Sequence, residues 1–226
     1  MIQIIDIPTE QTTAATDVLL AVISFFVARK VFQTGHRIDP QKTKIWVWAF
    51  GLLAFAAAFG AVAHGLQMSK LTNLILWQPL NLSLGIAIGL FVAGVVYDFR
   101  EFTLPRLLIP VMLVFAILFF TVTVLIPNAF IVFIIYEAIA MLFSFIVYTV
   151  MAARKQLKGA IWMSAGIFIT IVAAAIQAIE SIKIEFIWIF DHNGIFHIVQ
   201  ILGLFTLLKG LLIEFRSRMR QTATNK

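Results

Sequence analysis

Apolar residues fill seven long stretches of the chain, and connections that are polar or marked by proline separate them. A helix that crosses a bilayer needs about 20 mostly apolar residues, and each stretch approaches that length. We therefore predict an all-α, polytopic membrane protein with seven transmembrane helices. The predicted helices cover residues 15–34, 45–67, 80–98, 105–126, 129–152, 159–182 and 190–215. Short connections place neighbouring helices antiparallel, in an up-and-down bundle.

Composition supports the membrane assignment and limits the classes of function. The 226 residues are 62% hydrophobic and only 12% charged, whereas about 25% of the residues of a soluble protein are charged. We expect one transmembrane domain over residues 1–216, followed by a polar cytoplasmic tail over 217–226. The chain contains no cysteine, which excludes disulfides and thiolate metal sites.

The basic residues predict the orientation. When the connections are assigned to alternate sides, 15 of the 17 lysines and arginines fall on one side, and only Lys70 and Lys183 fall on the other. Cytoplasmic loops carry the excess of basic residues, so we expect the N-terminus outside and the C-terminus in the cytoplasm. The net charge of +6 is then an orientation signal and a contact with anionic lipid headgroups. It does not indicate binding of nucleic acid.

Three of the four histidines are expected at the outer membrane face. The stretch DHNGIFHIVQ, residues 191–200, opens the last predicted helix with His192 and His197, and His64 lies at the outer end of the second helix. His36 lies among basic residues in the first cytoplasmic loop, and we interpret it as an ordinary loop residue.

Further polar residues are expected in the same outer half of the bilayer. Glu137 lies eight residues below the outer start of the fifth helix, which is about 12 Å at 1.5 Å per residue. The others are Asn81, Ser83, Gln177, Glu180 and Gln200. An ionisable group within a span costs at least ~2.5 kcal/mol, so these residues predict an outward-facing polar cavity. The inner half of the helices is nearly bare of polar residues by comparison.

Histidines on two helices that meet are a pattern that zinc chemistry explains, because a catalytic zinc takes three protein ligands and one water. We predict a zinc site at His64, His192 and His197. On a regular helix His192 points roughly 140° away from His197, so both reach one metal only if His192 lies on an irregular turn before the helix. Asp191 favours such a turn. The alternatives are a hydrogen-bonded cluster without metal and, for Glu137, a simple pairing with Tyr136.

The histidine at the outer end of the second helix and the run GIFHIVQILG at the start of the seventh resemble the membrane superfamily of alkaline ceramidases and the adiponectin and progestin receptors. The resemblance implies a seven-helix fold, zinc bound by one histidine of the second helix and two of the seventh, and hydrolysis of lipid amides. The chain departs from the family pattern at Gly60, where the family has serine, and at Asn193, where it has histidine. The aspartate of the third helix has no clear equivalent. The sequence therefore resembles a divergent branch.

These observations predict a zinc-dependent membrane hydrolase that acts on a lipid amide or ester on the non-cytoplasmic side. Glu137, or alternatively Asp191, is the expected general base, and Asn81 or Gln78 is expected to stabilise the oxyanion. The lipid substrate would enter from the bilayer, because no extramembrane domain is expected. The alternative is a non-catalytic, lipid-binding or receptor-like bundle with the same polar pocket.

Overall fold

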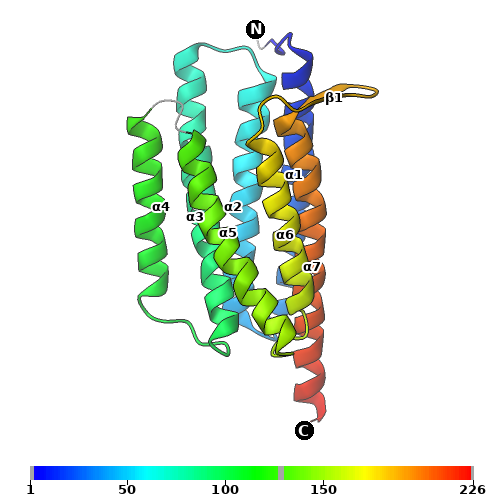
Figure 1. Cartoon of the computed structure of the whole chain (residues 1–226). Coiled ribbons are helices and arrows are strands. Elements are labelled where there is room, and N and C mark those ends of the chain that lie inside the picture. The colour runs from blue at the N-terminus through cyan, green and yellow to red at the C-terminus, as the bar shows by residue number, and fades with distance from the viewer. Residues whose placement is uncertain (1–2, 127–129, 225–226) are drawn as a thin grey trace.

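The structure is a computed structural model that describes residues 3–126 and 130–224. Within these ranges the chain forms seven helices and one two-stranded hairpin. The helices are α1 (Pro8–Gly35), α2 (Pro40–Gly65), α3 (Lys70–Phe99), α4 (Leu108–Leu125), α5 (Phe130–Ala153), α6 (Ala160–Gln177) and α7 (His192–Thr224), and the strands are β1 (Lys183–Glu185) and β2 (Ile189–Asp191). The helices lie side by side in one bundle, with the two termini at opposite ends (Figure 1). The predicted all-α bundle is confirmed.

Six of the described helices, α2 to α7, are long and apolar enough to cross a membrane, as a multi-pass membrane protein requires. Helix α1 is not among them, and it carries Glu10, Asp17, Arg29 and Lys30. It nevertheless runs along the bundle beside α2 and α7 (Figure 1). The seventh crossing therefore stays a prediction.

The ends of five helices differ from those predicted: α1 begins at Pro8 rather than at residue 15, α2 begins at Pro40 rather than at residue 45, and α3, α6 and α7 differ as follows. Helix α3 begins at Lys70 rather than at residue 80, because the Ser69 hydroxyl caps it by accepting the Thr72 backbone N–H, and Pro79 lies inside it. Helix α6 ends at Gln177 rather than at residue 182. Helix α7 continues to Thr224, so most of the expected polar tail is helical.

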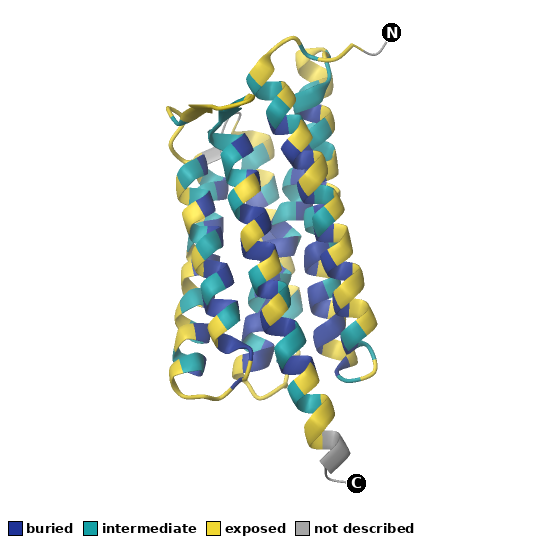
Figure 2. Cartoon of the chain, turned by 90° about the vertical axis from the view of Figure 1, so that its right-hand side faces the viewer, coloured by how far each residue is buried: buried dark blue, intermediate teal, exposed yellow. Residues whose placement is uncertain are grey.

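Large exposed apolar side chains follow the outward faces of the helices, as expected for surfaces that contact lipid. Phe25, Val114, Ile139 and Phe205 are each more than half exposed. Exposed and buried positions alternate around the helices along most of their length (Figure 2). A water-facing protein rarely leaves such large apolar areas uncovered, so this pattern supports a bilayer environment.

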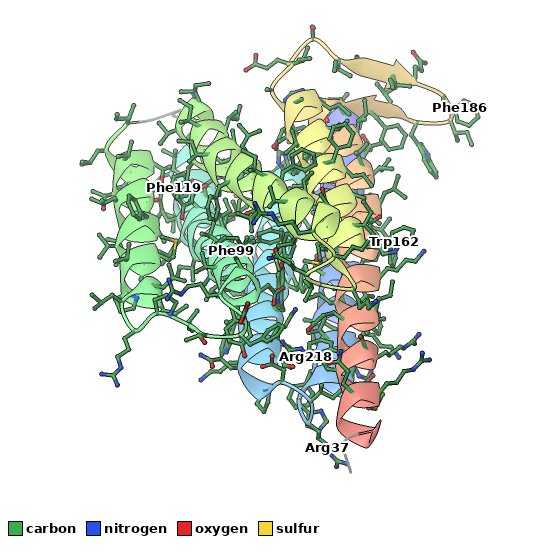
Figure 3. All side chains as sticks on the ribbon, turned by 60° about the horizontal axis from the view of Figure 1, so that its bottom comes forward. Arg37, Phe99, Phe119, Trp162, Phe186 and Arg218 are labelled. Atoms are coloured by element: carbon green, nitrogen blue, oxygen red, sulfur yellow. The ribbon has the colours of Figure 1, made fainter. Side chains whose placement is uncertain are left out.

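The hairpin occupies the segment between α6 and α7, where only a connection was predicted. Strands β1 and β2 pair antiparallel, with Ile184 opposite Phe190. The Thr12 hydroxyl of α1 donates to the Ile189 carbonyl at 2.6 Å and holds the base of the hairpin against the bundle. The hairpin extends sideways from the bundle, with Phe186 at its tip (Figure 3).

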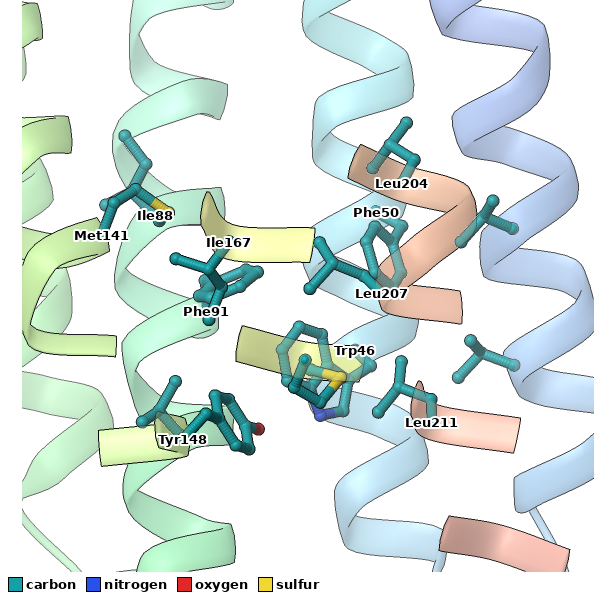
Figure 4. Close-up of a cluster of buried hydrophobic side chains, with 14 of the residues drawn as sticks. Trp46, Phe50, Ile88, Phe91, Met141, Tyr148, Ile167, Leu204, Leu207 and Leu211 are labelled. Atoms are coloured by element: carbon teal, nitrogen blue, oxygen red, sulfur yellow. The ribbon is translucent and has the colours of Figure 1, made fainter. Parts of the chain in front are cut away.

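The main apolar core runs along the inside of the bundle, and one part of it surrounds Trp46 of α2 (Figure 4). The indole is fully buried and contacts the edge of the Phe91 ring at a centroid distance of 4.9 Å. Gly94 of α3 makes room for the indole, because a Cβ there would lie 2.9 Å from it. Helices α6 and α7 approach even more closely, since a Cβ at Gly159 would lie 2.1 Å from the Gly210 carbonyl oxygen. Small residues at such crossings are typical of membrane bundles.

Candidate functional site

A cavity of about 620 Å³ runs along the inside of the bundle from its N-terminal end. Its wall follows α2 from His64 to Ala49, a length of roughly 22 Å at 1.5 Å per residue. Polar side chains gather at the His64 end, and apolar side chains line the rest. The apolar part includes Phe50, Leu53, Ile88, Phe91, Met141, Leu204 and Leu207. The cavity therefore has the shape and polarity of a site for an amphiphilic molecule.

Five of the six predicted site residues line this cavity: His64, His192, His197, Glu137 and Asn81. They come from α2, α3, α5 and α7, so the bundle brings together residues that are far apart in the sequence. Asp191 is not part of the lining, although it directly precedes His192.

His64 is held by a carboxylate that was not predicted. Its Nδ1 lies 2.6 Å from Glu10 Oε2 at the start of α1, and its ring meets the edge of Trp77 at a centroid distance of 5.4 Å. In the neutral imidazole, donation from Nδ1 to the Glu10 carboxylate leaves the lone pair on the other ring nitrogen, Nε2. A carboxylate that fixes the tautomer of an imidazole in this way is common beside both catalytic and metal-binding histidines.

His197 is buried against α1. Its Nδ1 lies 3.0 Å from the Thr16 hydroxyl, and its Nε2 lies 3.2 Å from Asp17 Oδ1. The second oxygen of Asp17, Oδ2, is buried in the cavity wall with no hydrogen-bond partner. Asp17, His64 and His197 all line the polar end of the cavity, and Asp17 contacts His197 directly, so we treat these three residues as one cluster.

Asp17 is the member of this cluster that sequence reasoning missed. Asp17 lies near the start of an apolar stretch. This position is compatible with a functional acid, but it is equally typical of a residue at the membrane surface. Gly60 makes room for it, because a Cβ at Gly60 would lie 2.8 Å from Asp17 Oδ2. The serine expected here from the ceramidase resemblance would occupy the same space.

His192 is the first residue of α7, immediately after β2. It lines the cavity, and its Nδ1 is buried without a hydrogen-bond partner. As they stand, no three histidine, aspartate or glutamate side chains among the described residues are arranged to hold a metal ion. Two of the predicted ligands, His64 and His197, thus share the cluster with Asp17, and no contact joins His192 to them.

Asp191 has a structural place at the junction of three elements. Its Oδ1 accepts the Thr13 hydroxyl of α1 at 2.8 Å and the Gly194 backbone N–H at 2.9 Å. The second contact caps the first turn of α7, as Asp commonly does. This oxygen therefore links α1 and the end of the hairpin to the start of α7.

The cavity wall contains an unusual number of unsatisfied polar atoms. Six of its residues carry a buried side-chain oxygen or nitrogen without a hydrogen-bond partner: Asp17, Gln78, Glu137, Gln177, His192 and Gln200. The Tyr136 hydroxyl donates to the Gly85 carbonyl instead of to Glu137, so the alternative pairing of Glu137 with Tyr136 is wrong. Each unpaired buried group costs about 1–3 kcal/mol, and a polar ligand would offset this cost.

A second polar cluster lies at the opposite end of the bundle, which the sequence analysis expected to be nearly bare. That expectation is wrong. The fully buried Lys42 ammonium donates to both oxygens of Asp98, at 2.7 and 2.8 Å, and to Glu214 Oε2 at 2.6 Å. The Tyr148 hydroxyl also donates to Asp98. These contacts join α2, α3, α5 and α7 through ionic hydrogen bonds.

The network extends through a second carboxylate. Asp39 caps α2 by accepting the Lys42 backbone N–H, and it also accepts the Tyr97 hydroxyl and the Arg218 guanidinium at 2.6 Å. Arg218 lies over the Phe102 ring and contacts Glu214 one turn earlier on α7. These contacts dock the end of α7 on the start of α2. We call this set of residues the inner network.

A family model matches residues 12–214, and it describes a family of unknown function, DUF6962. The chain belongs to this family. The match contains the Asp17–His64–His197 cluster and Lys42, Asp98 and Glu214, whereas Glu10 and Arg218 lie outside it. No curated protein and no solved structure matches the chain. The family therefore contributes no activity, and it does not bear on the resemblance to ceramidases.

Proposed function

We propose that the protein hydrolyses an amide or ester bond of a membrane lipid inside the cavity, on the non-cytoplasmic side of the bilayer. The observation that carries this proposal is the division of the cavity into a polar end with unsatisfied hydrogen-bonding atoms and an apolar part that reaches deep into the bundle. A lipid satisfies both parts at once, because its polar linkage meets the cluster at His64 while its chain lies among the apolar residues.

The proposed topology has seven crossings, with α1 as the first, the N-terminus outside and the C-terminus in the cytoplasm. Termini at opposite ends of the bundle support an odd number of crossings (Figure 1), and the distribution of basic residues supports the direction. Reporter fusions at the two termini test it. A cytoplasmic N-terminus would place the polar end of the cavity on the cytoplasmic side of the membrane and contradict the proposal.

The proposed chemistry uses residues of the polar cluster. His64, held through Nδ1 by Glu10, takes a proton from water at Nε2 as the water oxygen attacks the carbonyl carbon of the lipid. Amide groups of Asn81 and Gln78, both in the cavity wall, donate to the developing oxyanion. The protonated imidazole then returns its proton to the leaving amine or alcohol. Glu137, buried in the same wall, is the alternative base.

Zinc bound by His64, His192 and His197 is a separate part of the proposal. A zinc ion with an open position would supply hydroxide at neutral pH. In favour of a metal, His64 and His197 both have Nδ1 fixed by a neighbour, as metal-binding imidazoles usually do. Against it, the described side chains do not form a three-ligand group as they stand, and we derive no step of the reaction through zinc.

Metal analysis of the purified protein tests the zinc part alone. Stoichiometric zinc in the wild type that is lost in His64→Ala and His197→Ala would support it, with His36→Ala as the control because His36 lies in the α1–α2 connection. A metal-free protein whose melting temperature does not change on chelation would leave the hydrolase proposal without zinc.

Incubation with a panel of ceramides and other acyl lipids tests the hydrolase. We expect the wild type and His36→Ala to release fatty acid, and His64→Ala to lose at least ~100-fold of the rate, as is usual when a general base is removed. Glu137→Gln distinguishes the two candidate bases, since loss of turnover in this variant would transfer the role from His64 to Glu137. Absence of product from every lipid would contradict the proposal.

A non-catalytic lipid-binding or receptor-like role is the second candidate, and one observation favours it. Both ring nitrogens of His197 are already engaged, by Thr16 and Asp17, as in a polar pocket of fixed geometry. This role predicts saturable binding of a lipid without turnover, and binding that Glu137→Gln leaves largely intact.

A further inference from the structure

The hairpin between α6 and α7 exposes four large apolar side chains. Phe186 is 86% exposed, Ile187 73%, Trp188 64% and Ile184 51%. None of them belongs to a candidate membrane span among the described residues. A contiguous apolar patch outside the spans marks an interaction surface, because single apolar residues scatter over ordinary surfaces but rarely cluster.

The base of the hairpin is fixed, so its tip has a defined direction. Thr12 and Thr13 of α1 bind the Ile189 carbonyl and the Asp191 carboxylate at 2.6 and 2.8 Å. From this base the hairpin extends sideways beyond α1 and α7, at the end of the bundle where the N-terminus lies (Figures 1 and 3). A segment that leaves the end of membrane helices sideways runs along the bilayer surface, whereas one that continues the helix direction would enter water.

The chemistry of the tip matches that position. Tryptophan and other aromatic residues concentrate at membrane–water interfaces, where an apolar ring and a polar edge are both accommodated. Phe186, Ile187 and Trp188 are consecutive, while Lys183 and Glu185 lie nearer the base. The outward face of α7, the helix that follows the hairpin, is also apolar, with Ile198 42% and Leu202 56% exposed.

We infer that the tip of the hairpin, Phe186 to Trp188, inserts into the boundary between headgroups and acyl chains of the leaflet on the N-terminal side. Its occupant is the lipid bilayer itself, and the anchor lies beside the cavity. Strand β2 ends at Asp191, and the next residue, His192, is in the cavity wall. The inserted hairpin thus holds the outer rim of the cavity at the level of the lipid headgroups. This inference stands independently of any hydrolase activity.

The absence of cysteine from the chain makes a direct test possible. Single-cysteine variants carrying a nitroxide label are reconstituted into vesicles of phosphatidylcholine with a minor fraction of phosphatidylglycerol. The label at Phe186→Cys is compared with Ser181→Cys, an exposed position in the connection before the hairpin, and with Ile139→Cys, on the outward face of α5 and 67% exposed. Collision rates with oxygen, which partitions into lipid, and with a water-soluble nickel chelate report the depth of each label.

We expect the ratio of oxygen to nickel accessibility at position 186 to lie clearly above that of Ser181→Cys and below that of Ile139→Cys. A ratio equal to that of Ser181→Cys would place the tip in water and overturn the inference. Low accessibility to both reagents would show that protein covers the tip and would also overturn it, and dipolar broadening between labels would identify a second copy as the cover. Trp188→Cys repeats the measurement, and circular dichroism with thermal melting in detergent verifies the fold of each variant.

Discussion

The two polar regions of the bundle lie at opposite ends of the helices and differ in how their polar atoms are satisfied. At the end of the bundle where the N-terminus lies, six cavity residues have buried atoms without partners, and about 620 Å³ of space lies beside them. At the opposite end, the Lys42 ammonium and both oxygens of Asp98 are fully engaged in hydrogen bonds. Buried charges with complete partners hold helices together, whereas incomplete partners beside a cavity indicate a place for a ligand.

The energetic consequences of the two arrangements are opposite. Breaking a buried ion pair by removing one partner costs about 3–5 kcal/mol, because the remaining charge is left without compensation. Removing an unpaired buried charge relieves a desolvation cost. Substitutions in the inner network should therefore lower stability, and substitutions in the cavity should change ligand binding or turnover while stability is retained.

The largest expected effect is that of Lys42→Met. This change leaves Asp98 and Glu214 facing each other without the ammonium between them, and we expect a loss of about 3–5 kcal/mol of unfolding free energy. Thermal melting in detergent measures it. Lys44→Met is the matched control, because Lys44 is exposed two residues later. Equal melting temperatures for the two variants would show that the inner network does not stabilise the bundle.

A pair of identical substitutions compares the two regions directly. Glu214→Gln weakens a charged hydrogen bond to Lys42, and we expect a loss of about 1.5–3 kcal/mol. Glu137→Gln removes a buried carboxyl whose Oε2 has no partner, so we expect unchanged or slightly raised stability. Urea or thermal unfolding of both variants gives the difference. A greater loss for Glu137→Gln than for Glu214→Gln would reverse our interpretation of the two regions.

Among the substitutions expected to lower stability, the smallest loss is that of Gly60→Ala, which tests the cluster around Asp17. The added Cβ would lie 2.8 Å from Asp17 Oδ2, so the carboxylate must move, at a cost of about 1–3 kcal/mol and with loss of lipid binding or turnover. Gly51→Ala, where a Cβ meets nothing within 4 Å, is the control on the same helix. We expect Gly51→Ala to retain function and to gain about 0.5–1 kcal/mol from helix propensity. Full activity in Gly60→Ala would exclude a role for the position of Asp17.

Much of the candidate site was predictable because ionisable residues are rare in apolar stretches. His64, His197 and Glu137 stand out in the sequence for this reason, and all three line the cavity. Asp17 and Lys42 do not stand out, because each lies near the end of an apolar run, where a charge at the membrane surface is ordinary. Only the rotation of α1 and α2 about their axes determines that both side chains face the interior.

The sequence by itself determined the helical bundle, because in a bilayer a long apolar stretch must satisfy its backbone hydrogen bonds internally, and this property is local. It also placed two histidines, His192 and His197, at the start of the last helix. The tertiary structure alone decided that Glu10 holds His64, that Lys42 joins Asp98 and Glu214, and that the segment after Gln177 forms a hairpin docked on Thr12. These contacts join residues far apart in the chain, and their formation depends on the packing and rotation of neighbouring helices, which no periodicity along a single helix encodes.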